Sequence, residues 1–325
     1  MEENIFEQRI DLSALNNSIA DIRNEVNKVI VGQHKMVDLL LIGLLCDGHI
    51  LIEGVPGVAK TLTAKLLAKI IDLDFSRIQF TPDLMPSDVI GTSVFNPKES
   101  FFYFKPGPVF SNIILIDEIN RAPAKTQAAL FEVMEERQVT IDGVTHEMRF
   151  PFVILATQNP VEQEGTYRLP EAQLDRFIFK IDVQYPNLQE EINILKNQNG
   201  QTQMQLLAGV NTILSAHHIQ QYRDTIQSII IEPKLIEFIA KIVNETRNNP
   251  ALYLGASPRA SLAILRASKA SAAIKGRDFV MPEDIVEIAP AVLRHRIILT
   301  PEKEMEGLTP DDLIANILKT IEVPR

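Results

Sequence analysis

The sequence has only one cysteine, Cys46, and therefore cannot form an intrachain disulfide. This residue stands in an apolar stretch, where a small buried side chain is the simplest interpretation. The sequence also lacks an apolar run of about 18 residues, which a membrane-spanning helix would need. Its first residues show neither the basic region nor the apolar core of a signal peptide. We therefore expect a cytoplasmic protein without a membrane span.

Basic residues never occur in a run of five or more, and the net charge of the 325 residues is -10. A nucleic-acid-binding protein usually presents a cationic face that displaces counterions. Because lysine and arginine are interspersed with acidic residues, nucleic acid is not the expected partner. The hydrophobic fraction of 46% is enough for a sizeable core, and the length suggests about two domains.

Strand and helix patterns alternate in the first part of the chain. Short apolar runs predict strands near residues 49–53, 75–80, 113–116, 152–156 and 177–183. Helical spacing predicts helices over residues 12–29, 34–45, 60–71 and 124–136. This alternation indicates an α/β domain with a parallel sheet covered on both faces.

Strand signals fade after Tyr185-Pro186. Helices are expected over residues 192–207, 216–226, 233–248, 257–275 and 282–293, with a short helix or a tail after residue 299. The sequence therefore predicts two domains, an α/β core over residues 1–186 and a helical domain over residues 187–325.

A glycine-containing loop between the first strand and the next helix matches the P-loop pattern of Gly, four residues, Gly, Lys and Ser or Thr. The backbone N–H groups of such a loop and the N-terminus of the following helix bind phosphates. Lys60 would lie between the β- and γ-phosphates, and the Thr61 hydroxyl would bind Mg²⁺. Ala59 replaces the second glycine of the pattern. The expected ATP-binding residues here are Gly54, Val55, Pro56, Gly57, Val58, Ala59, Lys60, Thr61 and Leu62.

Two further strands end in polar residues at the expected ligand-binding edge of the sheet. The first ends in Asp117 and Glu118. Asp117 would hold Mg²⁺, and Glu118 would polarise the attacking water. The second ends in Asn159, whose amide could orient water beside the γ-phosphate. The alternative for Asn159 is a turn residue before Pro160.

Six segments of the chain resemble the MoxR family of AAA+ ATPases. They are VIVGQ, GVPGVAKT, TPDLMPSDVIG, ILIDEINRAP, ATQNPVEQEGTYRLPEAQLDRF and GASPRA, which span most of residues 29–260. The resemblance implies a P-loop AAA+ αβα core with a five-stranded parallel sheet of order 5-1-4-3-2, followed by an all-α lid domain. It also implies that ATP binds between the subunits of a ring, usually a hexamer. Ala59 is usual in P-loops of this family.

The resemblance assigns roles to further residues. Val31 and Gly32 resemble the segment beside the adenine, and Asn159 resembles the sensor of the γ-phosphate. Arg176 resembles the arginine finger that acts in trans, with Arg168 as a competitor. The alternative for Arg176 is a surface ion pair with Asp175 or Glu171. Arg259 resembles the lid sensor, and the alternative is an arginine in the first turn of a lid helix.

The resemblance also bears on partners. Residues 90–108 and 139–149 resemble hairpins that face a ring's axis, and Phe101, Phe102 and Phe104 either pack there or grip a substrate. MoxR relatives are thought to mature partner proteins, often with von Willebrand factor A domains. The leading hypothesis is therefore a remodelling ATPase. The alternatives are a motor subunit of a chelatase-like complex, a nucleotide-gated scaffold, and a DNA motor or transcription activator.

Overall fold

A computed structural model describes residues 9–55, 57–159, 167, 169–200 and 202–324 of the chain. The described residues fall into two compact units. The first, which we call the sheet unit, spans Ile22–Ala216. The second, which we call the lid unit, joins the N-terminal part of the chain up to Asp21 to residues 217–324. This division differs from the predicted domain border at residue 186.

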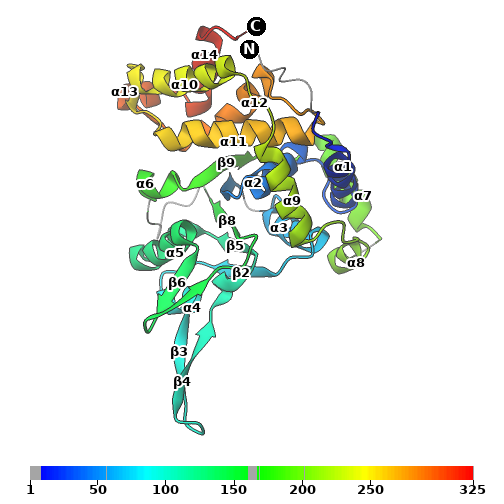
Figure 1. Ribbon diagram of the computed structural model, residues 1–325, viewed down its shortest axis with the longest axis vertical. Helices are drawn as coiled ribbons and strands as arrows, with labels where there is room; N and C mark the ends of the chain where they lie inside the picture. Colours follow the sequence, from blue (N-terminus) through cyan, green and yellow to red (C-terminus); the bar gives the residue numbers. More distant parts are fainter. Residues whose placement is uncertain (1–8, 56, 160–166, 168, 201, 325) are drawn as a thin grey trace. The chain divides into compact units, whose positions relative to one another are not determined.

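Five parallel strands form the centre of the sheet unit, in the order β2-β5-β8-β1-β9 (Figure 1). Their bounds are β1 (His49–Gly54), β2 (Phe75–Gln79), β5 (Ile113–Asp117), β8 (Val153–Gln158) and β9 (Phe177–Val183). Numbered along the chain, this is the predicted order 5-1-4-3-2, which is confirmed. Because every pairing in the sheet is parallel, the carboxyl ends of all five strands meet at one edge.

Helices accompany the strands of the sheet unit. They are α1 (Ser13–Asn27), which begins in the lid unit, α2 (His34–Leu45), α3 (Lys60–Ile70), α4 (Pro86–Ile90), α5 (Ala124–Glu136), α6 (Glu171–Leu174), α7 (Leu188–Gln198) and α8 (Gln203–Ala208). Two short 3-10 turns, η1 (Pro108–Phe110) and η2 (Ile119–Arg121), flank β5. A buried apolar core lies between the sheet and α5, where Phe131 meets Phe177 edge to face at 6.0 Å. The helices predicted over residues 34–45 and 124–136 are confirmed.

The single helix predicted over residues 192–207 is wrong, because two helices occupy this region. Each helix begins at an N-cap residue whose side chain accepts a backbone hydrogen bond, Asn187 for α7 and Thr202 for α8. The chain then returns to the sheet unit, where the backbone N–H groups of Ile213 and Leu214 donate to the carbonyl of Ile70. These hydrogen bonds explain why residues 187–216 belong with the sheet and not with the helical lid.

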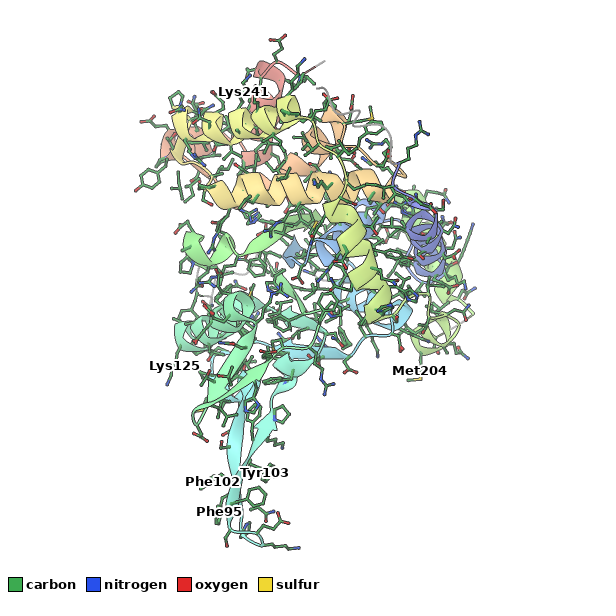
Figure 2. All side chains as sticks on the ribbon, in the orientation of Figure 1. Phe95, Phe102, Tyr103, Lys125, Met204 and Lys241 are labelled. Carbon is green, nitrogen blue, oxygen red and sulfur yellow. The ribbon has the colours of Figure 1, made fainter. Side chains whose placement is uncertain are left out.

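Two β-hairpins extend the sheet unit, as predicted. One is formed by β3 (Gly91–Asn96) and β4 (Phe101–Pro106), and the other by β6 (Gln138–Ile141) and β7 (Val144–Glu147). The rings of Phe104 and His146 stack at 4.2 Å between the hairpins, and the Ser93 hydroxyl donates to Asp142. Of the two roles considered for Phe104, the structure shows packing, against His146 of the second hairpin. The tip of β3–β4 lies far from the sheet and carries the exposed side chains of Phe95, Phe102 and Tyr103 (Figure 2).

The lid unit is mainly helical. Its helices are α9 (Ala216–Gln227), α10 (Pro233–Asn248), α11 (Pro258–Ile274), α12 (Pro282–Leu293), α13 (Pro301–Met305) and α14 (Pro310–Thr320). A small antiparallel ladder of β10 (Leu252–Leu254) and β11 (Ile298–Leu299) was not predicted from the sequence. The first part of α1 joins this unit, where the hydroxyls of Ser18 and Tyr222 are 2.8 Å apart. In the described part of the chain, no helix has the length and apolar character needed to cross a membrane.

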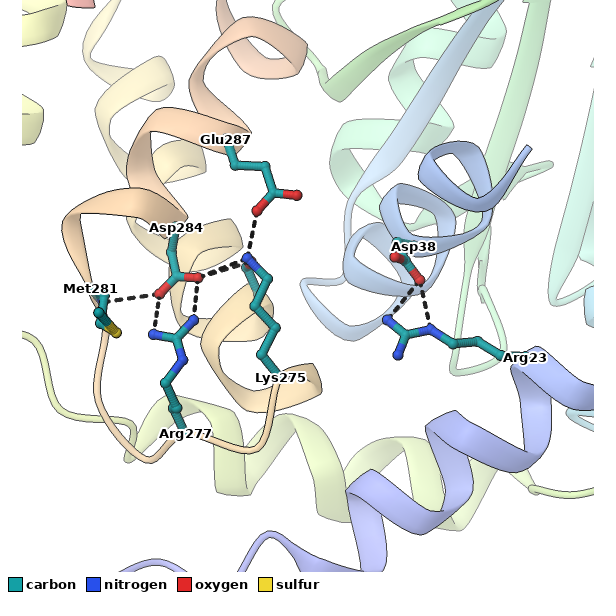
Figure 3. A network of polar contacts seen from close by, with 8 residues as sticks. Arg23, Asp38, Lys275, Arg277, Met281, Asp284 and Glu287 are labelled. Atoms are coloured by element: carbon teal, nitrogen blue, oxygen red, sulfur yellow. Dashed lines mark hydrogen bonds and ion pairs between the residues drawn. The ribbon is translucent and has the colours of Figure 1, made fainter. Parts of the chain in front are cut away.

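A buried carboxylate joins α11 to α12 within the lid unit (Figure 3). Asp284 is fully buried and accepts two hydrogen bonds from Arg277, each of 2.7 Å. It also accepts from Lys275 at 3.1 Å and from the backbone N–H of Met281 at 2.9 Å. Burial raises the pKa of Asp284, but the hydrogen bonds from Arg277, Met281 and Lys275 outweigh it and lower the pKa below its usual value. The network therefore keeps this carboxylate charged and orders the turn between the two helices.

His49 is a buried histidine at the start of the central strand β1, and its geometry predicts a pH-dependent stability. Its Nδ1 accepts from the N–H of Ile154 at 3.0 Å, so the proton sits on Nε2, which donates to the Met134 carbonyl at 3.1 Å. Burial, aided by the positive charge of Arg137, lowers the pKa of His49 from 6.5 to about 4. The folded protein therefore holds a neutral ring that the unfolded chain would protonate.

We expect the free energy of unfolding to fall by about 3 kcal/mol as the pH drops from 6.5 to about 4, because only the unfolded state gains a proton on His49 in that window. Chemical denaturation at several pH values measures this loss. The variant His49→Asn cannot titrate and should show a correspondingly weaker pH dependence in the same window. An equal loss in both proteins would show that His49 is not responsible.

Candidate nucleotide site

The loop between β1 and α3 has the backbone of a phosphate-binding turn. Gly57 has a φ of +88°, and a Cβ at that position would meet nothing within 4 Å. Ala59, the N-cap of α3, is left-handed with φ 60° and ψ 20°. Glycine adopts this conformation without cost, whereas alanine pays about 1 kcal/mol, which explains the glycine in the general pattern. Pro56 lies outside the described residues.

The N-terminus of α3 is not capped by a side chain. It has no side-chain cap and no acidic residue in its first turn. Its first N–H groups and its dipole thus remain available for an anion. Thr61 and Leu62 are half-buried in this turn, while Val58 is buried beneath the loop. Lys60 folds over the loop and donates to the carbonyl of Gly54 at 2.6 Å.

Lys60 lies in the field of carboxylates from two strands. Burial lowers the pKa of Lys60, while the charges of Asp117, Glu118 and Glu53 oppose that effect. The ammonium group is thus close to the end of β5 as well as to its own loop. The structure brings together Lys60, Asp117 and Glu118, which the sequence placed almost sixty residues apart.

Asp117 is the last residue of β5 and is 8% exposed. Its Oδ1 accepts a hydrogen bond of 3.2 Å from the Thr157 hydroxyl on β8. Its Oδ2 accepts one of 2.6 Å from Nε of Arg77 on β2. Both neighbouring strands of the sheet therefore orient this carboxylate.

Glu118 follows directly in a left-handed conformation, with a φ of 57°. Its N–H donates to the Thr157 hydroxyl at 3.1 Å, which fixes the turn that leaves the strand. Its Oε2 accepts from the amide of Gln79 at 2.7 Å and lies 3.0 Å from Nε of Arg121. Such a backbone conformation costs about 1 kcal/mol for a non-glycine residue and is common where side chains are held for function.

A cavity of about 490 Å³ opens beside the P-loop. It is lined by Glu53, Gly54, Val55, Asp182, Val183, Gln184 and Tyr185. These residues come from the ends of β1 and β9 and from the segment that leads to α7. The cavity therefore lies at the carboxyl edge of the sheet, where open α/β sheets bind their ligands.

Val31 and Gly32 lie next to the segment that leads into α7. Gln33 donates to the carbonyl of Gln184 at 3.2 Å. Gly32 has a φ of +69°, and a Cβ there would lie 2.4 Å from a carboxylate oxygen of Glu190. The left-handed backbone favours glycine at this position, whereas the flexible end of the Glu190 side chain could move away from a Cβ. Val31 and Gly32 are thus held near one end of the chain segment that lines the cavity.

Arg176 stands between α6 and β9, and its guanidinium contacts α5. Its Nη1 donates to the Phe131 carbonyl at 2.9 Å and to Glu135 at 2.8 Å. The ion pair is therefore with Glu135, whereas the sequence had offered Asp175 or Glu171. Asn159 is half-buried just beyond the end of β8. Arg168, the competitor for the trans contact, lies outside the described residues.

Arg259 belongs to the lid unit. It is exposed in the first turn of α11, and its N–H donates to the side chain of the N-cap residue Ser257 at 3.1 Å. Pro258 occupies the first helical position, which favours helix initiation. The side chain of Arg259 is thus on the surface of its own unit.

The residues proposed for Mg²⁺ fit that ion chemically. Thr61 offers a hydroxyl in the first turn of α3, and Asp117 offers a carboxylate at the end of β5. Mg²⁺ prefers oxygen ligands and usually combines one or two protein groups with phosphates and water. The charge of Asp117 also acts on Lys60, the residue before Thr61 in the chain.

Four side chains at this site were not predicted from the sequence: Arg77, Gln79, Arg121 and Thr157. Arg77 and Gln79 are two residues apart on β2 and contact Asp117 and Glu118 respectively. Polar residues at alternate positions of a strand in the core sheet were an available signal for a shared face. No local pattern indicates Thr157, because its role depends on the pairing of β8 with β5.

Two family models match the chain. The model for the ATPase family associated with various cellular activities (AAA) matches residues 49–179, which carry the P-loop, four of the five strands and the start of β9. The model for the AAA lid domain matches residues 244–317, within the lid unit. The two matches follow the same order as the α/β and helical parts of the chain.

Similar proteins match nearly the whole chain. The chain is 46% identical to YeaC of Bacillus subtilis over 92% of both sequences. It is 44% identical to the chaperone MoxR1 of Mycobacterium tuberculosis, covering 93% of this chain and 81% of the relative. The crystal structure of a proposed ATPase from Cytophaga hutchinsonii has a TM-score of 0.89 and 46% identity, covering 96% of this chain and 97% of the other.

Proposed function

Because the chain belongs to the MoxR family of AAA+ ATPases, we propose that it hydrolyses ATP between the subunits of a ring and uses the energy to remodel or mature a client protein. The observation that carries the proposal is the position of Lys60, beside an uncapped helix N-terminus and within the electrostatic influence of the carboxylates of Asp117 and Glu118. ATP hydrolysis in P-loop proteins uses a P-loop lysine together with carboxylates at the end of a neighbouring strand.

The P-loop residues from Gly54 to Thr61 would hold the phosphates through backbone N–H groups. Lys60 would leave the Gly54 carbonyl and place its charge on the β- and γ-phosphate oxygens. Val31 and Gly32 would lie on the adenine side, and Leu62 would support the first turn of α3. Burial of Lys60 strengthens its interaction with an anion, because the surrounding medium screens its charge less than water does.

The chemical step would depend on carboxylates at the end of β5. Glu118 would orient and polarise the attacking water, and its hydrogen bond from Gln79 and its ion pair with Arg121 hold the carboxylate in place for that task. Thr61 and Asp117 would hold Mg²⁺, which when bound neutralises charge that develops on the phosphate oxygens. Asn159 and Arg259 would contact the γ-phosphate, the first from the sheet unit and the second from the lid.

Arg176 would act on the nucleotide of a neighbouring subunit. An arginine supplied in trans accelerates phosphoryl transfer by about 10³- to 10⁵-fold. This role requires a homo-oligomeric ring, and a hexamer is the ring that the family favours. Arg168 is the competing candidate for the same contact.

The client would bind at the paired hairpins. The tip of β3–β4 presents Phe102 and Tyr103, which are 68% and 44% exposed. Exposed aromatic side chains on a projecting element are typical of protein contact sites. Figure 2 shows them at the end of the hairpin farthest from the sheet. We take a cytoplasmic protein with a von Willebrand factor A domain as the client class.

Replacing Phe102 and Tyr103 together by serine should abolish client binding without changing basal ATP turnover, because the tip lies far from the P-loop. The probe is a purified von Willebrand factor A domain protein from the same genome, and the readouts are its binding and its effect on ATP turnover. The variant Met204→Ser removes an exposed apolar side chain elsewhere in the sheet unit and serves as the control. If the wild type neither binds nor responds to the probe, the client assignment is wrong.

Two other functions would give different results in the same assays. A nucleotide-gated scaffold would assemble with ATP but would not turn it over. A motor subunit of a chelatase-like complex would turn ATP over without responding to the von Willebrand factor A probe. Ordinary ATP turnover together with a response to the probe would exclude both alternatives.

A further inference from the structure

Arg176 is held by α5 in an unusual way, because both of its hydrogen bonds use the same nitrogen. Nη1 donates to the Phe131 carbonyl at 2.9 Å and to Oε2 of Glu135 at 2.8 Å. A guanidinium carries five N–H donors, of which Nη1 provides two. Both donors of this nitrogen are therefore engaged within the subunit.

The other two nitrogens of the Arg176 guanidinium, Nε and Nη2, make no hydrogen bond to the described residues. Nε is buried and has no hydrogen-bond partner in the described part of the chain. No hydrogen bond from Nη2 to any described residue is formed either, and 27% of the side chain is exposed. The strongest arginine–carboxylate contact is bidentate, with two nitrogens of the guanidinium donating parallel hydrogen bonds to the two carboxylate oxygens. An ion pair with a purely structural role would be expected to have that geometry. The observed geometry leaves Nη2 and its two donors unengaged.

The two anchors of Nη1 both belong to α5. Phe131 is 2% exposed and packs against Phe177, the residue that follows Arg176 in the chain. Glu135 lies one helical turn after Phe131 on the same face of α5. The chain next to Arg176 therefore packs, through Phe177, against the same helix that contacts the arginine side chain.

We propose that Glu135 is the positioning residue of Arg176. It fixes one terminal nitrogen of the guanidinium so that the other points outward, toward the phosphate of a neighbouring subunit. A long arginine side chain loses rotamer entropy when it is fixed, and with this anchor the loss occurs before ATP arrives. This inference rests on the proposed function, because it requires Arg176 to act in trans.

The test is a double-mutant cycle on the assembled protein. The variants are Glu135→Ala, Arg176→Ala and the combination, and steady-state ATP turnover is measured for each. Glu135→Ala should lower kcat by about 10- to 100-fold, because a misplaced catalytic group loses that much, and should change KM for ATP little. In the Arg176→Ala background, the same change should have no further effect.

Two more variants separate positioning from a structural role. Glu135→Gln keeps an oxygen acceptor for Nη1 and should recover most of the lost kcat. Glu132→Ala removes another exposed carboxylate of α5 and should leave kcat unchanged. Thermal unfolding and particle mass are measured for every variant, so that a fall in turnover is compared only among folded rings.

Several outcomes would overturn the proposal. A fall in kcat of equal size with and without Arg176 would show that Glu135 merely supports α5. A rise in kcat would show that Glu135 restrains the arginine, and an unchanged kcat would show that it does neither. If instead Arg176→Ala itself leaves turnover intact, the trans assignment of Arg176 fails, and that result is distinct from failure of the positioning role alone.

Discussion

Replacing Glu118 by glutamine is expected to lower ATP turnover by about 10²- to 10⁴-fold while ATP still binds. The amide keeps the size of the side chain and can still accept the hydrogen bond from Gln79, although it loses the ion pair with Arg121, so the local structure should largely persist. An amide is a far weaker base than a carboxylate and cannot polarise the attacking water. Binding of a fluorescent ATP analogue and phosphate release measure the two effects separately.

The matched control for this variant is Glu136→Gln, which makes the same chemical change on the exposed surface of α5. Its turnover should equal that of the wild type. Rings of Glu118→Gln should form with ATP and persist, because the nucleotide is not consumed. If Glu118→Gln hydrolyses ATP at the wild-type rate, a different residue activates the water and the proposed role of Glu118 is wrong.

Replacing Arg176 by alanine should lower turnover by about 10³- to 10⁵-fold, because the charge that an arginine finger brings to the transition state is lost. Affinity for ATP should change little, since the P-loop that binds the phosphates belongs to the other subunit of the pair. The wild type should show turnover per subunit that rises with protein concentration as rings form. Phosphate release across a dilution series, with particle mass recorded at each point, checks both statements.

Arg168→Ala is the comparison that decides between the two candidate arginines. If its turnover falls as far as we expect for Arg176→Ala while Arg176→Ala stays active, the finger is Arg168. If turnover per subunit does not depend on concentration across the transition from monomer to ring, neither arginine acts in trans. The pair with Glu135 in α5 favours Arg176, because that geometry leaves one terminal nitrogen unengaged.

Much of the sheet unit could be predicted from the sequence, because its signals are local. Buried parallel strands read as short apolar runs, and the loop from Gly54 to Thr61 has a fixed spacing. The hairpin over residues 139–149 contains Asp142-Gly143, a dipeptide typical of tight hairpin turns. The strand order, by contrast, came from the family resemblance, since no local pattern encodes which strands are neighbours.

The features that the sequence did not predict depend on contacts between distant segments. Arg77 and Thr157 reach Asp117 only because β2 and β8 flank β5 in the sheet. The segment after α8 belongs with the sheet because Ile213 bonds to Ile70, nearly 150 residues earlier. The partner of Arg176 was missed for the same reason, since Glu135 is far away in the sequence but adjacent in space.

The site has a second property that only the structure reveals. Ala59, in the P-loop, and Glu118, directly after β5, both adopt left-handed backbone conformations. Each conformation costs about 1 kcal/mol, and tertiary contacts must offset it. For Glu118 such a contact is visible, because Thr157 accepts its N–H and also bonds Asp117.

Mixing the two inactive variants tests most directly whether ATP is hydrolysed between subunits. Glu118→Gln retains Arg176, and Arg176→Ala retains Glu118, so a mixed ring contains interfaces where both intact groups meet. We predict that ATP turnover, nearly absent in each variant alone, reappears on mixing and follows the fraction of mixed rings determined by mass. A mixture that forms mixed rings yet stays as inactive as its components would contradict hydrolysis at a shared site.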